Sequence, residues 1–129
     1  MQVYTEERTV TQQDIDALNH VNNVRYVEWV QAVSESHWLK TTDARTRKDL
    51  VWVVKNHNIT YKRSAVLGDS LEIRTFIQDT KGPLSIRVVE ILNNKTQQLL
   101  VYAITEWCLL DGLSLKPKRV PEAIQKLFG

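Results

Sequence analysis

Hydrophobic side chains recur at helical spacing between residues 24 and 39. Members of this stripe follow one another at intervals of one, three or four positions: Tyr26, Trp29, Val30, Val33 and His37. Such a stripe lies along one side of an α-helix, with charged residues on another side. The pattern predicts one helix of about 16 residues, about 24 Å long. Asn22 or Asn23 stands where the N-cap of this helix belongs.

Elsewhere, apolar and polar residues alternate at every second position, which is the period of a β-strand. A clear case is the segment 69–79, in which Leu71, Ile73 and Ile77 share one face. The pattern predicts strands over the following ranges: 2–11, 51–63, 69–79, 84–92 and 97–111. A short helix is expected at the C-terminal end, over residues 121–129.

This order of elements, one long helix followed by a run of antiparallel strands, predicts the α+β class. One helix covers a single face of such a sheet and leaves the other face uncovered. The strand at 97–111 is apolar on both faces, which favours a further layer or a partner subunit. We therefore expect a homodimer or a homotetramer.

Composition narrows the class of protein. The 129 residues suffice for one domain, 1–129, and the formal net charge of +2 falls short of a nucleic-acid-binding signature. The longest apolar run, "LLVYAI", is far below the ~20 residues of a membrane helix. The single cysteine, Cys108, excludes an internal disulfide and favours a reducing compartment. Since the N-terminus also lacks a signal-peptide pattern, we expect a cytoplasmic protein with neither nucleic-acid nor membrane partners.

The stretch "DIDALNHVNNVRYVEWV", residues 14–30, concentrates polar side chains just ahead of the predicted helix. Six of them fall within ten residues: Asp14, Asp16, Asn19, His20, Asn22 and Asn23. Asp and Asn are ordinary capping and turn residues, so one interpretation is an elaborate helix start. A helix needs one cap, however, and the surplus of carboxylate, amide and imidazole groups favours an active site.

This stretch, together with "NITYKRSAVLGDSLEI" at residues 58–73, resembles the hotdog-fold thioesterases. The similarity is to acyl-CoA thioesterases related to 4-hydroxybenzoyl-CoA thioesterase and to the plant-type acyl-ACP thioesterases. In both groups an Asp-x-Asp segment precedes the central helix and the phrase "HVNN" recurs. The resemblance implies an antiparallel sheet of about five strands wrapped around one long helix. It also implies dimers whose sheets join edge to edge, with active sites between protomers.

Within this resemblance, Asp16 matches the Asp that acts as nucleophile or general base, and Asp14 matches a structural one. Thioester hydrolysis needs an activated water or a nucleophile and donors for the oxyanion. The free N–H groups of the first helical turn are suited to the second task. His20 matches the His of the plant-type enzymes. Two roles are open for it: a catalytic group, or a residue that only hydrogen-bonds within the loop. In the plant-type enzymes an Asn stands two residues after the catalytic Asp. Leu18 holds that position here, and the adjacent Asn19 is the expected substitute for the Asn.

The expected substrate-binding residues surround this cluster in sequence: Asn22, Asn23, Tyr26, Tyr61 and Arg63. Ser64 and Ala65 stand where the plant-type enzymes carry a Glu or Cys, which favours a mechanism centred on Asp16 with backbone donors. His37 and His57 lie on packed faces, and no paired-Cys or HxxxH spacing appears. We therefore expect neither a metal site nor a cofactor.

The function implied is an acyl-CoA thioesterase that releases a free acid and CoA. Two alternatives stay open at this point. An acyl-ACP thioesterase keeps the chemistry and takes the acyl group from a carrier protein. A hotdog module that binds an acyl thioester without turnover is compatible with the departures at Leu18, Ser64 and Ala65.

Overall fold

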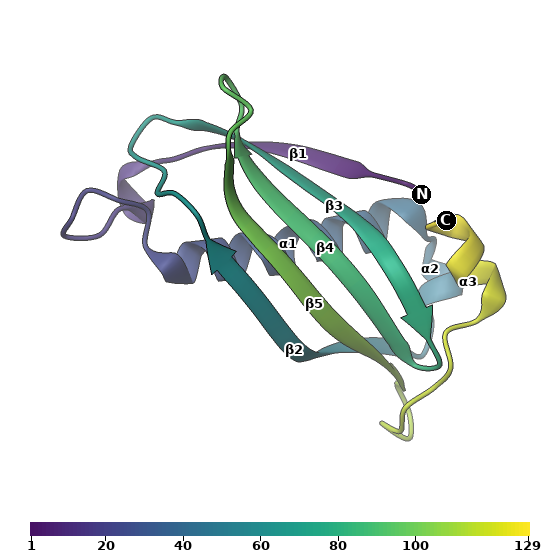
Figure 1. The fold of residues 1–129 in the computed structure, drawn as a ribbon. Coiled ribbons are helices and arrows are strands. Elements are labelled where there is room, and N and C mark those ends of the chain that lie inside the picture. Colours follow the sequence, from purple (N-terminus) through teal and green to yellow (C-terminus); the bar gives the residue numbers. More distant parts are fainter.

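The computed structural model describes all residues, 1–129, and arranges them as five antiparallel strands in front of one long helix (Figure 1). The elements in chain order are β1 (Tyr4–Thr9), η1 (Gln12–Asp14), α1 (Asn23–Thr41), α2 (Ala44–Arg47), β2 (Leu50–Tyr61), β3 (Ser70–Lys81), β4 (Leu84–Asn93), β5 (Leu99–Asp111) and α3 (Glu122–Leu127). The strand order in the sheet is β1-β3-β4-β5-β2. The predicted α+β class with about five strands and one long helix is confirmed.

Helix α1 begins and faces the sheet as its sequence pattern predicts. The side-chain oxygen of Asn22 accepts a hydrogen bond from the Val24 N–H at 3.0 Å, which caps the first turn. The buried residues of the helix are those of the predicted stripe together with Ser34: Tyr26, Trp29, Val30, Val33 and His37. Ser34 is tolerated in the core because its hydroxyl donates to the Val30 carbonyl at 2.7 Å.

Each central strand turns alternate residues towards α1 and towards the outside. Leu71, Ile73, Ile91 and Ala103 form part of the main core beneath the helix and are 0–2% exposed. Strand β2 is the long, open edge of the sheet, since its one strand partner is β5. Strand β1, at the other edge, has half as many residues, 6 against 12.

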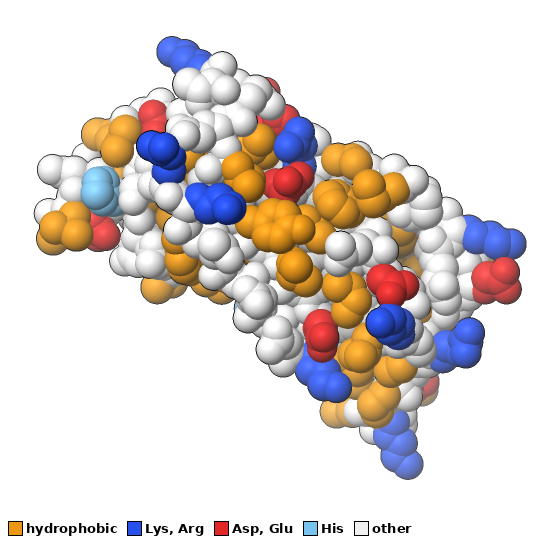
Figure 2. Space-filling view, in the orientation of Figure 1, with side chains coloured by type: hydrophobic (Ala, Val, Ile, Leu, Met, Phe, Trp, Pro, Cys, Tyr) orange, Lys and Arg blue, Asp and Glu red, His pale blue; other side chains and the backbone are white.

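The outward face of the sheet is also rich in apolar side chains, as Figure 2 shows across the middle of the molecule. Phe76, Val88 and Ile104 are cross-strand neighbours on this face. Val51 and Val53, further along, are each 39% exposed. The prediction that β5 is apolar on both sides is confirmed, because Tyr102, Ile104 and Cys108 alternate with buried residues.

Two short elements depart from the sequence expectations. The charged segment 41–49, for which the sequence predicts neither the long helix nor a strand, contains the single turn α2. Asp43 stabilises this turn by accepting a hydrogen bond from the Thr46 N–H at 2.7 Å. Strand β1 is shorter than expected because the chain turns into η1 after Val10. None of the helices combines the length and the apolar character that crossing a membrane requires.

Candidate active site

The polar cluster forms a closed loop of residues 14–22, which projects beyond the N-terminal end of α1 (Figure 1). Ile15 and Val21 pair at its base. Inside it, the Asp16 N–H donates to the His20 carbonyl at 2.8 Å. A hydrogen bond from the Val21 N–H to the Ala65 carbonyl, 3.0 Å, ties the base to the segment 62–69. The two motifs picked out in the sequence are therefore neighbours in space.

Asp16 is half-buried and held in one orientation by its own loop. Its Oδ1 accepts hydrogen bonds from the N–H groups of Leu18 at 2.9 Å and His20 at 3.3 Å. Its Oδ2 makes no hydrogen bond within the chain. One oxygen of the carboxylate thus stabilises the turn. The other oxygen is available to accept a proton from a water molecule or to attack the carbonyl carbon of a thioester.

Asp14 is buried and structural, as expected. Its Oδ2 accepts from the Thr11 N–H at 2.9 Å, and its Oδ1 lies 3.4 Å from Arg25 Nε. Its carbonyl accepts from the Asn22 N–H at 2.9 Å. These contacts join η1, the polar loop and the first turn of α1.

The polar neighbours of Asp16 have different local roles. Asn19 adopts a left-handed backbone conformation, with φ of 61°, which Asn tolerates better than most residues. The His20 imidazole is exposed and free of hydrogen bonds to the chain, so its contacts with Asp16 run through its main chain. Asn23 is exposed at the first helical position beside the cap, Asn22. A catalytic contribution from Asn19 or His20 stays a prediction.

Tyr26 links α1 to the second motif from inside the core. It is 2% exposed, and its hydroxyl accepts a hydrogen bond from the Ala65 N–H at 3.0 Å. Burial raises the pKa of this phenol. The ring of Tyr61 lies 5.8 Å from that of Tyr26 and is 43% exposed, and the exposed Arg63 follows two residues later. Direct contact of these three side chains with a substrate stays a prediction.

Exposed apolar side chains border the polar loop. Leu18 projects from the loop itself, Val24 from the start of α1, and Val66 and Leu67 from the segment tied to it. Their exposed fractions lie between 43% and 73%. Grouped apolar surface next to an oriented carboxylate is suited to an amphipathic ligand or to a partner subunit.

A second polar centre, which sequence reasoning missed, lies inside the core beneath the other half of α1. Arg87 on β4 is 5% exposed, and its Nη1 donates to Thr75 Oγ1 at 2.9 Å and to His37 Nδ1 at 2.8 Å. The sequence held a signal for it. Arg87 occupies an inward-facing position of β4, next to the outward-facing Val88, and the other inward-facing positions of this strand hold small or apolar residues.

The hydrogen bonds fix the protonation of His37. A guanidinium has no acceptor, so Nδ1 must accept from Arg87 and Nε2 carries the proton that it donates to Gln2 Oε1 at 2.8 Å. Burial and the neighbouring charge of Arg87 lower the pKa of His37 from 6.5 to about 4. The packed position expected for His37 is confirmed, with 1% exposure.

Stability should therefore fall as the solution is acidified. Because the pKa is lower in the folded chain, the unfolded chain binds the extra proton between pH 6.5 and about 4. We expect acidification across this window to lower the free energy of unfolding by on the order of 2–3 kcal/mol more in wild type than in His37→Gln. Urea unfolding at several pH values measures the difference. Parallel pH profiles for the two proteins would contradict this account of His37.

The chain is similar to known thioesterases. The family model described as the thioesterase-like superfamily matches residues 10–128. The long-chain acyl-CoA thioesterase FadM of Escherichia coli (strain K12) is 32% identical over 102 residues, which cover 75% of this chain and 75% of that protein.

Solved structures agree with this similarity. The structure of YbaW, a probable thioesterase from Escherichia coli, has a TM-score of 0.85 and 26% identity, covering 95% of this chain and 94% of that one. A mutant of 4-hydroxybenzoyl-CoA thioesterase complexed with 4-hydroxybenzoyl-CoA has a TM-score of 0.89 over 100% of both chains. At 18% identity, this second likeness concerns the hotdog fold alone.

Proposed function

The chain belongs to the thioesterase-like superfamily and is a thioester hydrolase, and from this premise we propose that it cleaves acyl-CoA thioesters with Asp16 as the general base or nucleophile. The observation that carries the proposal is the geometry of this carboxylate. Hydrogen bonds from two backbone N–H groups to Oδ1 fix its orientation, and Oδ2 is free to activate water or to attack the substrate. The second motif lies beside the loop that carries Asp16, since the Val21 N–H donates to the Ala65 carbonyl at 3.0 Å.

The reaction follows from the groups at hand. As general base, Asp16 Oδ2 takes a proton from water while the hydroxide adds to the thioester carbonyl. N–H groups at the start of α1 stabilise the oxyanion; the Val24 N–H is already used by Asn22, so the neighbouring Asn23 N–H is the better donor. The intermediate then expels CoA thiolate, which takes up the proton held by Asp16, either directly or relayed by the exposed His20 or by water. The free acid and CoA leave, and the Asp16 carboxylate is restored.

The surroundings of Asp16 suit an acyl-CoA. Apolar side chains at Leu18, Val24 and Leu67 offer contacts for the acyl part. Lys62 and Arg63 are exposed on the segment fastened to the loop and carry the charge needed for the CoA phosphates. The similarity to a long-chain acyl-CoA thioesterase supports the same class of substrate.

A panel of thioesters tests the proposal. Acyl-CoA esters of increasing chain length, an aromatic acyl-CoA and the matching acyl-ACP esters are incubated with the enzyme, and free thiol is measured. We expect turnover of acyl-CoA, with kcat/KM no lower than for the matching acyl-ACP. A large preference for the carrier-protein ester would instead support the acyl-ACP alternative.

We also propose that the protein is a homo-oligomer joined through β2. This strand is 12 residues long and forms an edge of the sheet, so its outer N–H and C=O groups have no strand partner. Natural proteins rarely leave such an edge open. Pairing of β2 with its copy in a second chain would join two sheets and cover the edge.

Light scattering behind a size-exclusion column tests the assembly. The mass expected is twice, or for a tetramer four times, the 15.0 kDa of one chain. A mass of 15.0 kDa at micromolar concentration would contradict the proposal. Cytoplasmic location is proposed too, on the ground that the one cysteine, Cys108, is free; fractionation of the source cells tests it.

A further inference from the structure

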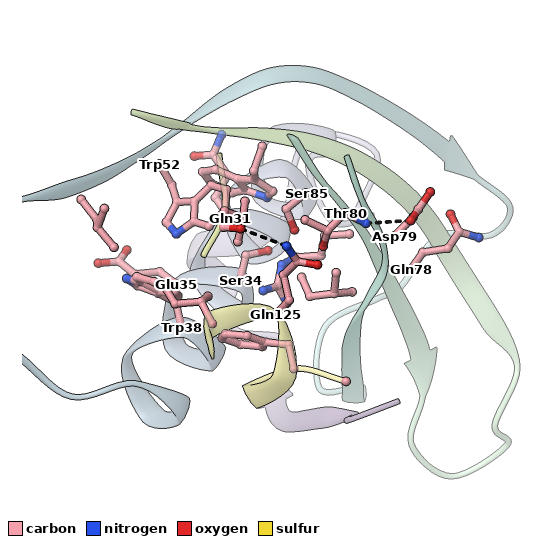
Figure 3. A pocket seen from close by; sticks show the side chains of 18 residues that line it. Gln31, Ser34, Glu35, Trp38, Trp52, Gln78, Asp79, Thr80, Ser85 and Gln125 are labelled. Atoms are coloured by element: carbon pink, nitrogen blue, oxygen red, sulfur yellow. Dashed lines mark hydrogen bonds between the residues drawn. The ribbon is translucent and has the colours of Figure 1, made fainter. Parts of the chain in front are cut away.

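A cavity of about 580 Å³ lies between the C-terminal half of α1, the β3–β4 hairpin and α3. It is distinct from the polar loop: its first helical lining residue, Gln31, comes eight positions after the start of α1 at Asn23. Eight residues of α-helix span about 12 Å. In Figure 3, Ser34 and Gln125 point into the cavity from α1 and α3, while Gln78 lies at its rim.

One part of the cavity wall is apolar and aromatic. It is formed by side chains of the second hydrophobic cluster and their neighbours: Trp38, Trp52, Ile124 and Phe128. The volume of the cavity lies within the range of cavities that hold small organic ligands, about 300–1,000 Å³. This wall accommodates the hydrocarbon or aromatic part of a ligand.

Another part of the wall carries a buried positive charge. Arg87 lines the cavity, is 5% exposed and has no carboxylate within 4.0 Å to pair with. Its hydrogen bonds to His37 and Thr75 both leave from Nη1, so Nε and Nη2 have no partner in the chain. A buried charge of this kind is costly unless an opposite charge meets it.

The acidic residues near the cavity do not fill this role. Glu35 and Asp79 line it but are exposed, and Asp79 lies 3.7 Å from Lys81. The Nε1 of Trp107, another lining residue, is buried without an acceptor. Two side chains of the wall thus have unused donors, and a carboxylate is the ordinary partner for a guanidinium fork.

We propose that this cavity binds a carboxylate attached to an apolar body, such as a free fatty or aromatic acid, with Arg87 as the anchor for the carboxylate. The apolar body lies against Trp38, Trp52 and Phe128. The inference goes beyond thioester hydrolysis, since it needs neither Asp16 nor turnover, and it adds an acid-binding site at the other end of α1.

The test uses octanoate, phenylacetate and their neutral amides, octanamide and phenylacetamide, with acetate as the charge without an apolar body. Binding is followed by quenching of tryptophan fluorescence and by the rise in Tm. We expect saturable binding of octanoate or phenylacetate to wild type, and at least tenfold weaker binding of both amides and of acetate. Equal binding of an acid and its amide would overturn the proposal, and this comparison needs no variant.

Variants then locate the site. Arg87→Met should weaken octanoate binding at least tenfold, whereas Arg74→Met, the same change at an outward-facing strand arginine paired with Glu90, should leave it unchanged. Asp16→Asn should also leave it unchanged. Loss of octanoate binding in Asp16→Asn with retention in Arg87→Met would place the acid at the polar loop and overturn the proposal, whatever the outcome of the thioester panel.

A final arm separates a free acid from a carboxylate at the far end of an acyl thioester. Octanoyl-CoA and suberoyl-CoA are compared as substrates of wild type and Arg87→Met. An unchanged ratio of their KM values, together with weakened octanoate binding, supports the free acid proposed here. A KM that rises for suberoyl-CoA alone would overturn the free-acid assignment.

Discussion

Asp16→Asn should lower kcat/KM for acyl-CoA hydrolysis by about 10²–10⁴-fold, the range that a general base contributes. The asparagine keeps an oxygen in the place of Oδ1, so the hydrogen bonds from the Leu18 and His20 N–H groups are retained. The polar loop should therefore keep its shape while the group that activates water is lost. Free-thiol release under kcat/KM conditions measures the effect, and Tm checks the fold.

Asp49→Asn is the matched control for this variant. Asp49 is exposed, lies in the loop before β2, and has a left-handed φ of 59° that asparagine also adopts. It should hydrolyse acyl-CoA at the wild-type rate. If Asp16→Asn does so too, Asp16 is a loop residue and another group must activate the water.

Tyr26→Ala should lower the free energy of unfolding by about 3–5 kcal/mol, as large-to-small changes of buried aromatic residues do. The ring is 2% exposed, and its loss would leave a cavity between α1 and the sheet. The Ala65 N–H would also lose its acceptor. Chemical denaturation measures the change, with the m-value checked to be the same for the variant and the wild type.

Tyr26→Phe separates the hydroxyl from the ring. Removing the acceptor of the Ala65 N–H should cost about 1–3 kcal/mol, the range for a buried group left without its partner. Tyr102→Phe, on the outward face and without a hydrogen bond from its hydroxyl, should stay within about 0.5 kcal/mol of wild type. Equal effects of the two Tyr→Phe changes would mean that Tyr26 does not hold the second motif to the helix.

Most of the fold could be predicted from the sequence because two periods dominate it. Intervals of three and four residues place Tyr26 and Val30 under the sheet, and alternation places Leu71 and Ile73 opposite them. Short elements were harder to predict. The single turn α2 depends on one capping bond from Asp43, and a tendency so local leaves no periodic signal.

The sequence could name candidate residues, whose catalytic and binding roles stay predictions, but not the geometry in which they lie. Its motifs named Asp16, His20 and Arg63, yet no spacing in the sequence shows that one oxygen of Asp16 is occupied and the other free. The contact between Arg87 and His37 joins residues 50 positions apart. Pairings of this kind depend on strand register and on the angle at which the helix crosses the sheet, and both are properties of the assembled chain.

The two ends of the chain lie together, as Figure 1 shows. The Gln2 N–H donates to the Phe128 carbonyl at 3.4 Å, and the Gln2 side chain reaches His37. Gly129 lines the cavity that holds Arg87.

An affinity tag at either end would therefore emerge beside this cavity and compete with whatever enters it. Tag position becomes an experimental variable, and cleaved protein is the proper material for measuring ligands. For protein engineering, the same neighbourhood makes the termini a natural place to join the chain head to tail and open it elsewhere.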